Sequence, residues 1–387
     1  MSKTYVKDIV VIVIATLLVP IALVQRVQSY MIYYYVRWYC SLILAGLIVI
    51  VFLIRYRSTQ IKIGMRYRYA LLLVFIVSSL YSSFLNRSYS NLHVGIFNVL
   101  MLFEVFVSIA YISSINRIKL FKKLITVYAV LLCTANDLLM FGAPSTFFGN
   151  GNFLLYSKFY IAYLHIIALG LLYEKLNRIQ IYLLSAVIFA IFQYIHSGTG
   201  TIGLIVFVIF ISFPSRVRAL FAQRKYAFAT LIISSLFVYL RNIILSSPLI
   251  QFIVVSVLHK SLDLTSRVYI YNSIGKILFV KPYFGFGQEN NYLACQTYLK
   301  ISKYEYAPDV QNGLLDWVVS YGFIGAIMLI IFVISCFNKE HVDSYLVPIL
   351  MSYFIMGSVE IPFDIMFFFV LALFVYSIKE KDYLSYE

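Results

Sequence analysis

Charged residues are scarce in this chain of 387 residues: they make up 12% of it, against about 25% in an average soluble domain. Hydrophobic residues make up 62%. The net charge of +15 is compatible with nucleic-acid binding, but the basic residues fall in short loops beside long apolar runs, which argues against that class. The composition therefore excludes an ordinary soluble domain.

Several chemical motifs are also missing. The four cysteines have no paired spacing, which excludes a disulfide framework and a zinc site. There is no Asp-x-Asp, no Gly-rich phosphate loop with Lys, and no His–Cys ligand spacing. We therefore expect no metal and no cofactor, and a cytoplasmic nucleotide-sugar enzyme is disfavoured. Residues 8–24 are apolar without a small-residue cleavage site after them, so they form a first span rather than a signal peptide.

Long apolar runs dominate what is present. Runs of this length are candidate membrane spans, and because they are continuous rather than alternating they predict helices, not barrel strands. The sequence predicts an all-α polytopic membrane protein, a single integral membrane domain over residues 1–387 with about twelve transmembrane helices. The predicted spans are 8–24, 38–54, 69–85, 94–115, 121–140, 154–172, 179–195, 200–213, 227–245, 314–337, 345–359 and 362–378.

The charge of the loops alternates along the chain and sets a topology. Placing the N-terminus in the cytoplasm puts 20 of the 31 basic residues in cytoplasmic segments. Those residues are Lys3, Lys7, Arg55, Arg57, Lys62, Arg66, Arg68, Arg117, Lys119, Lys122, Lys123, Lys175, Arg178, Arg216, Arg218, Arg224, Lys225, Lys339, Lys379 and Lys381. The prediction is a multi-pass protein of the cell membrane with both termini cytoplasmic. The long loop 246–313, between spans nine and ten, is then extracytoplasmic.

The long loop contains a short amphipathic helix by its pattern. Within SRVYIYNSIGKILFV (266–280), apolar residues recur at positions 270, 274, 277 and 278, which is helical spacing. Such a helix is expected to lie on the membrane surface. KPYFGFG (281–287) then ends it with one proline and two glycines.

Five ionisable residues lie at the outer or middle level of predicted spans: Glu104, Asp137, Lys158, His165 and Arg241. A charge within the membrane costs roughly 2.5–3.5 kcal/mol on insertion scales and is functional by default. Lys158, Arg241 and Asp137 are near the outer ends of their spans, where snorkelling to the surface is an equal alternative. Glu104 needs a partner, either an ion pair between spans or a substrate, and His165 is either a base or a satisfied interior histidine.

In the long loop, Arg267 opens the amphipathic segment. Its guanidinium matches diphosphate oxygens in two bonds and suits a lipid diphosphate headgroup, with general attraction to anionic lipid as the alternative. Gly285 and Gly287, in FGFGQEN (284–290), offer either a backbone anion site or a simple turn.

DVQNGLLDW (309–317) closes the loop and leads into span ten. It places Asp309, Gln311, Asn312 and Asp316 at the membrane surface, where amides and carboxylates suit sugar hydroxyls and a carboxylate can accept a proton. The alternative is a helix start capped by Asp309 or Asn312.

Four stretches together resemble a known family, the Wzy-type polysaccharide polymerases of the O-antigen ligase/polymerase superfamily, in particular the capsular polymerases of Gram-positive bacteria. The stretches are GNGNFLLYSKFYIAYLHII (149–167), HSGTGTIGLIVFVIF (196–210), LTSRVYIY (264–271), and KPYFGFG with VQNGLLDWVVSYGFIGAIMLI (310–330). LTSRVYIY departs from the family's Leu-Thr-Gly-Arg pattern, with Ser266 in place of glycine. The resemblance covers most of residues 145–335.

The resemblance implies an enzyme that joins oligosaccharide repeat units carried on undecaprenyl diphosphate, at the outer face of the membrane and without a metal. It implies that Arg267 binds the diphosphate, with Arg241 or Lys158 as a second cation. The ligase branch has a proposed histidine base where this chain has Gln311, which cannot act as a base. Asp309 and Glu289 are our candidates for that role.

Other functions fit parts of the pattern. A flippase for lipid-linked oligosaccharide, or another transporter, fits twelve spans with intramembrane charges but not the long loop. A polysaccharide ligase of the same superfamily differs only in its acceptor, and a membrane scaffold leaves the loop motifs unused. The expected partners are the lipid-linked oligosaccharide and membrane lipid, with a flippase and a chain-length regulator as further candidates, and no nucleic acid.

Overall fold

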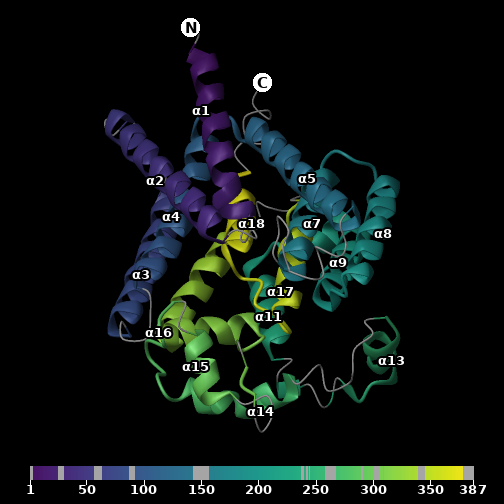
Figure 1. The fold of residues 1–387 in the computed structure, drawn as a ribbon. Coiled ribbons are helices and arrows are strands. Elements are labelled where there is room, and N and C mark those ends of the chain that lie inside the picture. Colours follow the sequence, from purple (N-terminus) through teal and green to yellow (C-terminus); the bar gives the residue numbers. More distant parts are fainter. Residues whose placement is uncertain are drawn as a thin grey trace.

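A computed structural model of the chain contains only helices and their connections in the part that it describes, residues 3–24, 30–55, 63–86, 92–142, 157–236, 239–240, 243, 245–257, 267–288, 291–299, 305–307, 309–338 and 345–377 (Figure 1). The helices of the first half are α1 (Lys3–Leu18), η1 (Val19–Leu23), α2 (Tyr30–Arg55), α3 (Ile63–Leu85), α4 (Leu92–Ser114), α5 (Ile118–Gly142), α7 (Lys158–Tyr173) and α8 (Arg178–Tyr194). The second half contains α9 (Gly198–Ser212), α10 (Ser215–Phe221), α11 (Arg224–Ser235), α13 (Pro248–Phe252), η2 (Ile253–Val257), α14 (Arg267–Leu278), α15 (Asn291–Tyr298), α16 (Gly313–Cys336), α17 (Val347–Met356) and α18 (Ile365–Tyr376).

Each predicted span contains one of these helices. Five helical stretches of the described chain are long and apolar enough to cross a membrane: Tyr5–Leu23, Tyr67–Leu85, Val94–Ser114, Ile118–Gly142 and Gly313–Cys336. The other apolar helices have 10–17 residues. The chain is therefore a helical membrane protein, and its twelve crossings stay a prediction.

Several helix starts are fixed by the side chain that precedes them. Asn177 forms a capping box at the start of α8: its Oδ1 accepts from Gln180 N at 2.9 Å, and Gln180 Oε1 accepts from Asn177 N at 3.0 Å. Ser157 caps α7 by accepting from Phe159 N, and Ser197 caps α9 by accepting from Gly200 N, each through its hydroxyl oxygen. Short polar residues thus satisfy N–H groups that a helix start would otherwise leave unpaired.

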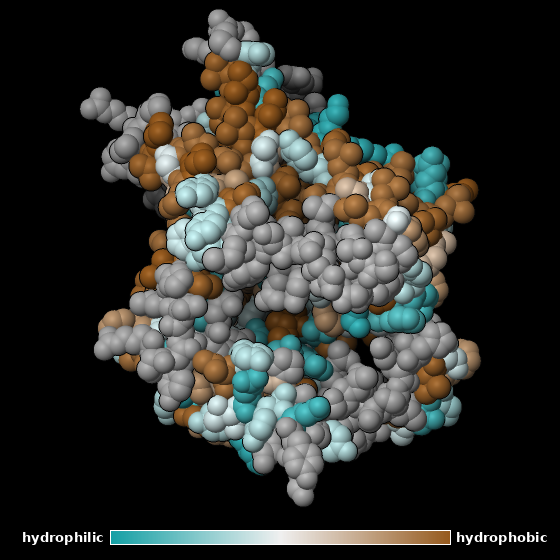
Figure 2. Space-filling view, viewed as in Figure 1, coloured by the Kyte–Doolittle hydropathy of each residue, from teal (hydrophilic) through white to brown (hydrophobic). Residues whose placement is uncertain are grey.

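The inner helices differ from the outer ones in burial. Every residue of α18 is buried, and α18 lies at the centre of the bundle (Figure 1). A helix that is apolar on all sides must be surrounded by other apolar groups. α3, α5 and α8 instead expose apolar side chains such as Val77, Leu131 and Leu183. Apolar residues also dominate the visible surface over α1, as expected where helices face lipid (Figure 2).

One end of the bundle gathers the basic residues, and we call it the basic end. Arg117 pairs with Asp8 at 2.6 Å, and Lys122 pairs with Glu174. Arg68 donates to the carbonyl of Ser335 at 3.2 Å, and Arg224 donates to the carbonyl of Phe337 at 3.0 Å. These contacts join the starts of α3, α5 and α11 to the ends of α7 and α16, which is the antiparallel order that the charge alternation predicts.

The long loop forms a compact layer at the opposite end, which we call the loop layer (described residues 267–312). The predicted amphipathic helix is present as α14, and Ile270, Ile274, Ile277 and Leu278 are all buried. Their partner is not the membrane surface that we expected. They share a small apolar core with α15, the segment 307–310 and the first part of α16.

Span 314–337 was predicted as one helix, and the structure corrects this. The backbone at Gly322 is not helical (φ 67°, ψ −179°), and α16 consists of two helical segments that meet there. The first segment packs against the loop layer, whereas the second packs along α3 toward the basic end. The two segments therefore run in different directions (Figure 1). Only the second segment follows the bundle.

Candidate functional site

The turn 281–287 fills the break in α16. Two N–H groups of the turn, those of Phe286 and Gly287, donate to the carbonyls of Val319 and Ser320 at 2.8 and 2.9 Å. On the other side of the break, the N–H groups of residues 323 and 324 donate to the carbonyls of residues 282 and 283 at 2.7 and 3.2 Å. Non-helical backbone at membrane depth is tolerated where protein groups satisfy it, and here the turn does so.

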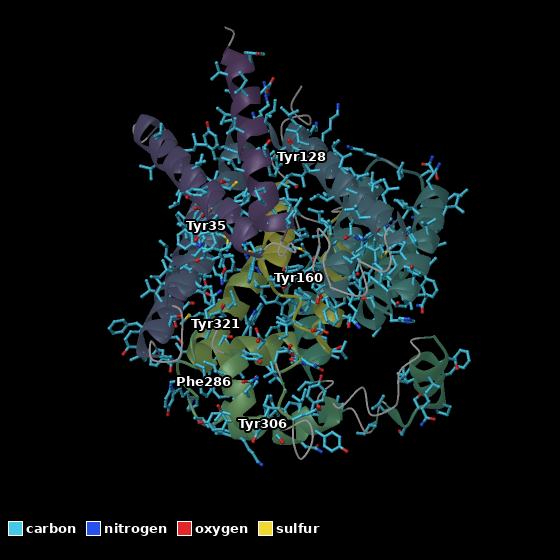
Figure 3. The ribbon with its side chains drawn as sticks, in the orientation of Figure 1. Tyr35, Tyr128, Tyr160, Phe286, Tyr306 and Tyr321 are labelled. Atoms are coloured by element: carbon cyan, nitrogen blue, oxygen red, sulfur yellow. The ribbon has the colours of Figure 1, made fainter. Side chains whose placement is uncertain are left out.

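The end of α3 holds this turn in place. Ser82 donates to the carbonyl of Phe284, and Asn86 Nδ2 donates to the carbonyl of Gly285 at 3.0 Å. Lys281 donates to Asn86 Oδ1. Gly285 and Gly287 both have positive φ, 64° and 86°, and both N–H groups donate to carbonyl oxygens. The glycines therefore form the turn that was the alternative to an anion site, and an anion would have to displace these bonds. Phe286, in the turn, and Tyr321, just before the break, both lie at the lower left of the molecule in Figure 3.

The segment 309–312 lies at the start of α16 and is tightly bonded. Asp309 Oδ1 accepts from Gln311 N at 2.9 Å. Gln311 has a left-handed backbone (φ 48°), and its carbonyl accepts from the hydroxyl of Tyr271 on α14 at 2.9 Å. The Oε1 atom of Gln311 is buried without a hydrogen-bond partner in the described part of the chain.

Asn312 is a junction of three elements and caps α16, as one of the sequence alternatives predicted. Its Oδ1 accepts from Leu315 N at 3.1 Å. Its Nδ2 donates to the carbonyls of Ser235 at the end of α11 and of Ser358 after α17, at 3.4 and 3.3 Å. Gly313 N adds a bond to the carbonyl of Gly357 at 2.8 Å. The loop layer is thereby fixed to the connection between α17 and α18.

That connection, residues 357–364, is the hairpin tip. Helices α17 and α18 have 10 and 12 residues. At 1.5 Å per residue they are too short for a hydrocarbon core of about 30 Å. Most of the tip is buried in the protein, and it carries two carboxyl groups, the buried Glu360 and the half-buried Asp364. Asp364 Oδ1 caps α18 by accepting from Met366 N and Phe367 N at 2.9 and 3.3 Å. Asp364 Oδ2 is buried and has no partner in the described residues.

Further polar groups surround Asp364. Arg37 on α2 interacts with it electrostatically and donates from one Nη to the carbonyl of Ile21 at 3.3 Å, and its buried Nε has no hydrogen-bond partner among the described residues. Tyr163 on α7 and Tyr353 on α17 lie with ring centroids 5.4 Å apart. Both hydroxyls are buried without a hydrogen-bond partner among the described residues. We call Arg37, Tyr163, Tyr353 and Asp364 the polar cluster.

Four of the five ionisable residues predicted inside spans, all but Arg241, have ordinary partners. His165 Nδ1 bonds the carbonyl of Ile161 at 2.7 Å, and its Nε2 bonds Asp137 Oδ2 at 3.1 Å. His165 is thus the satisfied interior histidine of our two alternatives, and Asp137 has a partner besides solvent. Ser41 Oγ lies 2.8 and 2.7 Å from the two carboxyl oxygens of Glu104, so that a hydroxyl replaces the ion pair between spans. Lys158 is exposed and reaches the carbonyl of His196 at 3.5 Å.

The predicted site residues are brought together only in part. Asp309, Gln311 and Asn312 are neighbours, whereas the turn that contains Gly285 and Gly287 lies at the other end of the first segment of α16, where Gly287 N donates to the carbonyl of Ser320. Arg241 and Glu289 lie outside the described residues. Arg267 is the first residue of α14, one turn before Tyr271, and its side chain also lies outside them. No group of three metal-ligating side chains occurs among the described residues.

Sequence reasoning missed the polar cluster. Arg37 precedes a predicted span by one residue, Glu360 lies in the break between the last two spans, and Asp364 is the third residue of the last span. Charges at or beside the ends of apolar runs look like solvated loop residues, and a tyrosine within a run looks like core. The available signal was the spacing: only two residues, 360 and 361, separate those two predicted spans, too few for a solvated turn that places two carboxylates in water.

A search of protein-family models, of curated proteins and of solved structures finds no match for this chain.

Proposed function

We propose that the protein is a metal-independent glycosyltransferase that polymerises oligosaccharide units carried on a lipid diphosphate. One observation carries the proposal. The segment 309–312, which resembles a polymerase motif, is bonded through Asn312 to a hairpin tip with two carboxyl groups beside a buried polar cluster. A layer of loop helices thus lies over polar groups inside the membrane part, which is the arrangement that a lipid-borne sugar substrate needs.

The proposed orientation places the basic end in the cytoplasm and the loop layer outside, as the excess of basic residues indicates. Thr297 is exposed on α15 and suits a single-cysteine test, with Lys175 at the basic end as its matched control. In intact cells, Thr297→Cys should react with an impermeant thiol reagent and Lys175→Cys should react only after lysis. The reverse pattern would place the loop layer inside and remove the proposal.

Arg267 is the proposed ligand of the donor diphosphate. Arg267→Ala should stop polymer formation and leave single lipid-linked units, because a guanidinium binds a diphosphate through two parallel bonds. Arg267→Lys should restore activity only in part, because an ammonium lacks that fork. Lys276→Ala, an exposed basic residue at the end of the same helix, is the control and should make normal polymer. Polymer of normal length from Arg267→Ala would assign Arg267 to lipid attraction instead.

Gln311 and Asn312 are proposed to position the acceptor sugar, with Lys158 or Arg241 as a second cation. Asn312 does so by holding the hairpin tip, since both ends of its amide are bonded to protein. Asp309 and Glu289 are the candidates for the proton acceptor that the sequence offers, and Asp364 in the polar cluster is a third. The decisive assay uses purified lipid-linked repeat units in liposomes with EDTA and without nucleotide sugar. Elongation under these conditions is the expected result, and a requirement for divalent metal would refute the mechanism.

A transporter is the second candidate, and a break within a predicted span, as in α16, is the observation that raises it. Transporters use the free backbone groups of discontinuous helices to bind ions or substrate. In this chain the turn 281–287 already bonds four backbone groups on the two sides of Gly322. Those groups are therefore not free to bind an ion or a substrate, as they would be in a transporter. In the liposome assay a transporter would move units across the bilayer and leave them single.

A further inference from the structure

The polar cluster is an unusual place in the described structure because four polar atoms on four helices or helix starts are buried without a partner. They are Arg37 Nε, the hydroxyls of Tyr163 and Tyr353, and Asp364 Oδ2. Most buried polar groups in proteins are hydrogen-bonded, and each exception requires an explanation. Four exceptions at one place indicate a site whose partner is a bound molecule.

The groups belong to one site by their mutual interactions. Asp364 interacts electrostatically with Arg37 and with both tyrosines, and Glu360 interacts with Tyr163. The rings of Tyr163 and Tyr353 are 5.4 Å apart, and Tyr353 lies 5.8 Å from Phe367. Figure 2 shows a hollow at the centre of this face, and Tyr160, on the same helix as Tyr163, lies in this central region in Figure 3.

The chemistry of the cluster selects the ligand. A carboxylate accepts hydrogen bonds, a guanidinium donates them, and a phenol does both. Together they match the adjacent hydroxyls of a sugar, and the aromatic rings supply apolar faces. A phosphate would be repelled by Asp364 and Glu360, and a lipid chain would leave all four atoms unpaired.

We propose that the polar cluster binds the acceptor saccharide and that Asp364 accepts the proton of its attacking hydroxyl. This inference rests on the proposed polymerase function. The acceptor oxygen forms a bond to the anomeric carbon of the donor while the bond from that carbon to the diphosphate oxygen breaks. The lipid diphosphate leaves with the electron pair, and the hydroxyl proton passes to Asp364 Oδ2 and then to the released diphosphate.

The two oxygens of Asp364 allow its capping and chemical roles to be separated. Asn caps helices as well as Asp does, so Asp364→Asn keeps the cap through its remaining oxygen and loses the proton acceptor. We expect it to lower kcat by roughly 10²–10⁴-fold with little change in KM. Tyr163→Phe and Tyr353→Phe remove hydroxyls that bond no described residue, so they should keep the stability of the wild type and raise KM by roughly 3- to 10-fold each, the effect of one hydrogen bond. Asn177→Ala, which loses the cap of α8 at the basic end, should lower stability and leave both constants unchanged.

Binding gives a second measurement that does not depend on turnover. Trp38 follows Arg37, and Trp317 lies 4.9 Å from Phe363, next to Asp364, so tryptophan fluorescence reports on the cluster. The probe is the oligosaccharide released by mild acid from lipid-linked units of the producing cells. It should change the fluorescence of the wild type and of Asp364→Asn, and bind more weakly to the Tyr163→Phe/Tyr353→Phe variant.

The outcomes distinguish the two proposals. Equal binding by wild type and the double tyrosine variant, or no binding at all, would mean that the cluster holds water and would overturn the inference whatever the polymerase assay shows. Elongation at the wild-type rate by Asp364→Asn would overturn the role of Asp364 and leave the polymerase standing. Unit translocation without elongation by the wild type would overturn the polymerase, while saccharide binding at the cluster would still be measured.

Discussion

Replacing Gly322 by alanine should separate α16 from the turn 281–287. Gly322 adopts φ 67° and ψ −179°, a region that essentially only glycine populates, and forcing another residue into it costs about 1–3 kcal/mol. An added Cβ would also overlap the backbone of Tyr283 and Phe284. Because backbone atoms cannot rotate away as a side chain can, the turn itself has to leave.

The loss of the turn determines how strongly Gly322→Ala destabilises the protein. Four backbone hydrogen bonds join it to α16 across the break, at 2.7–3.2 Å. At about 0.5–1.5 kcal/mol net each, they contribute roughly 2–6 kcal/mol, and with the backbone penalty the change destabilises by about 3–9 kcal/mol. Gly275→Ala is the matched control, because a Cβ at this helical position of α14 meets nothing within 4 Å. It should stabilise the protein by about 0.5–1 kcal/mol.

The unfolding of these variants can be followed through the buried cysteines. Cys133, Cys295 and Cys336 are buried, so a fluorogenic thiol dye reports unfolding of the purified protein in detergent as temperature rises. We expect Gly322→Ala to melt well below the wild type and Gly275→Ala to melt at or slightly above it. A Gly322→Ala protein as stable as the wild type would show that α16 is continuous and that the turn lies elsewhere.

Three further predictions use buried groups. His165→Leu should destabilise by about 3–5 kcal/mol because it leaves Asp137 without its imidazole partner, and a double variant with Asp137→Leu should recover much of that loss in the same melting assay. Glu104→Gln should fold and melt like the wild type, because a charged carboxylate whose partner in the membrane interior is a hydroxyl would be too costly. Unfolding of Glu104→Gln would indicate that the carboxylate is ionised. Ser41→Ala, which removes the hydroxyl partner of Glu104, should lower stability by about 1–3 kcal/mol. Burial, with Asp316 and Asp309 nearby, raises the pKa of the Cys295 thiol, so at pH 8 maleimide should leave it unlabelled until the protein is denatured, as mass spectrometry can show.

The helices were predictable because their cause is local. Continuous apolar runs can satisfy their backbone in lipid only as helices, and a helix occurs in each of the twelve predicted runs. The spacing of residues 270, 274, 277 and 278 predicted α14 and its buried face. The prediction that this face lies on the membrane surface was wrong, because periodicity shows that a face is apolar but not whether lipid or protein covers it.

The break in α16 could not be predicted because its cause is distant in the sequence. The run around Gly322 is apolar, and glycine is common in membrane helices. What opens the helix there is the turn 281–287, about forty residues earlier, whose N–H and C=O groups replace the helical ones. A prediction from the apolar run alone therefore gives one span where two segments exist.

The segment 309–312 explains why a motif can mark a site without supplying its chemistry. Asn312 uses its Oδ1 in the cap of α16 and its Nδ2 on two carbonyls, and Gln311 uses its backbone N–H and C=O. These bonded groups have little capacity left for a substrate, and Gln311 Oε1, which is buried without a partner among the described residues, is an amide oxygen that cannot act as a base. A carboxyl oxygen with spare capacity lies instead at Asp364, where one oxygen caps a helix and the other bonds nothing among the described residues. A sequence shows the cap, which any polar residue at a helix start can form, but not the second oxygen's surroundings, which depend on α2, α7 and α17. The motif thus holds the hairpin tip in position, and the proposed proton acceptor is a residue whose sequence pattern predicts only a helix start.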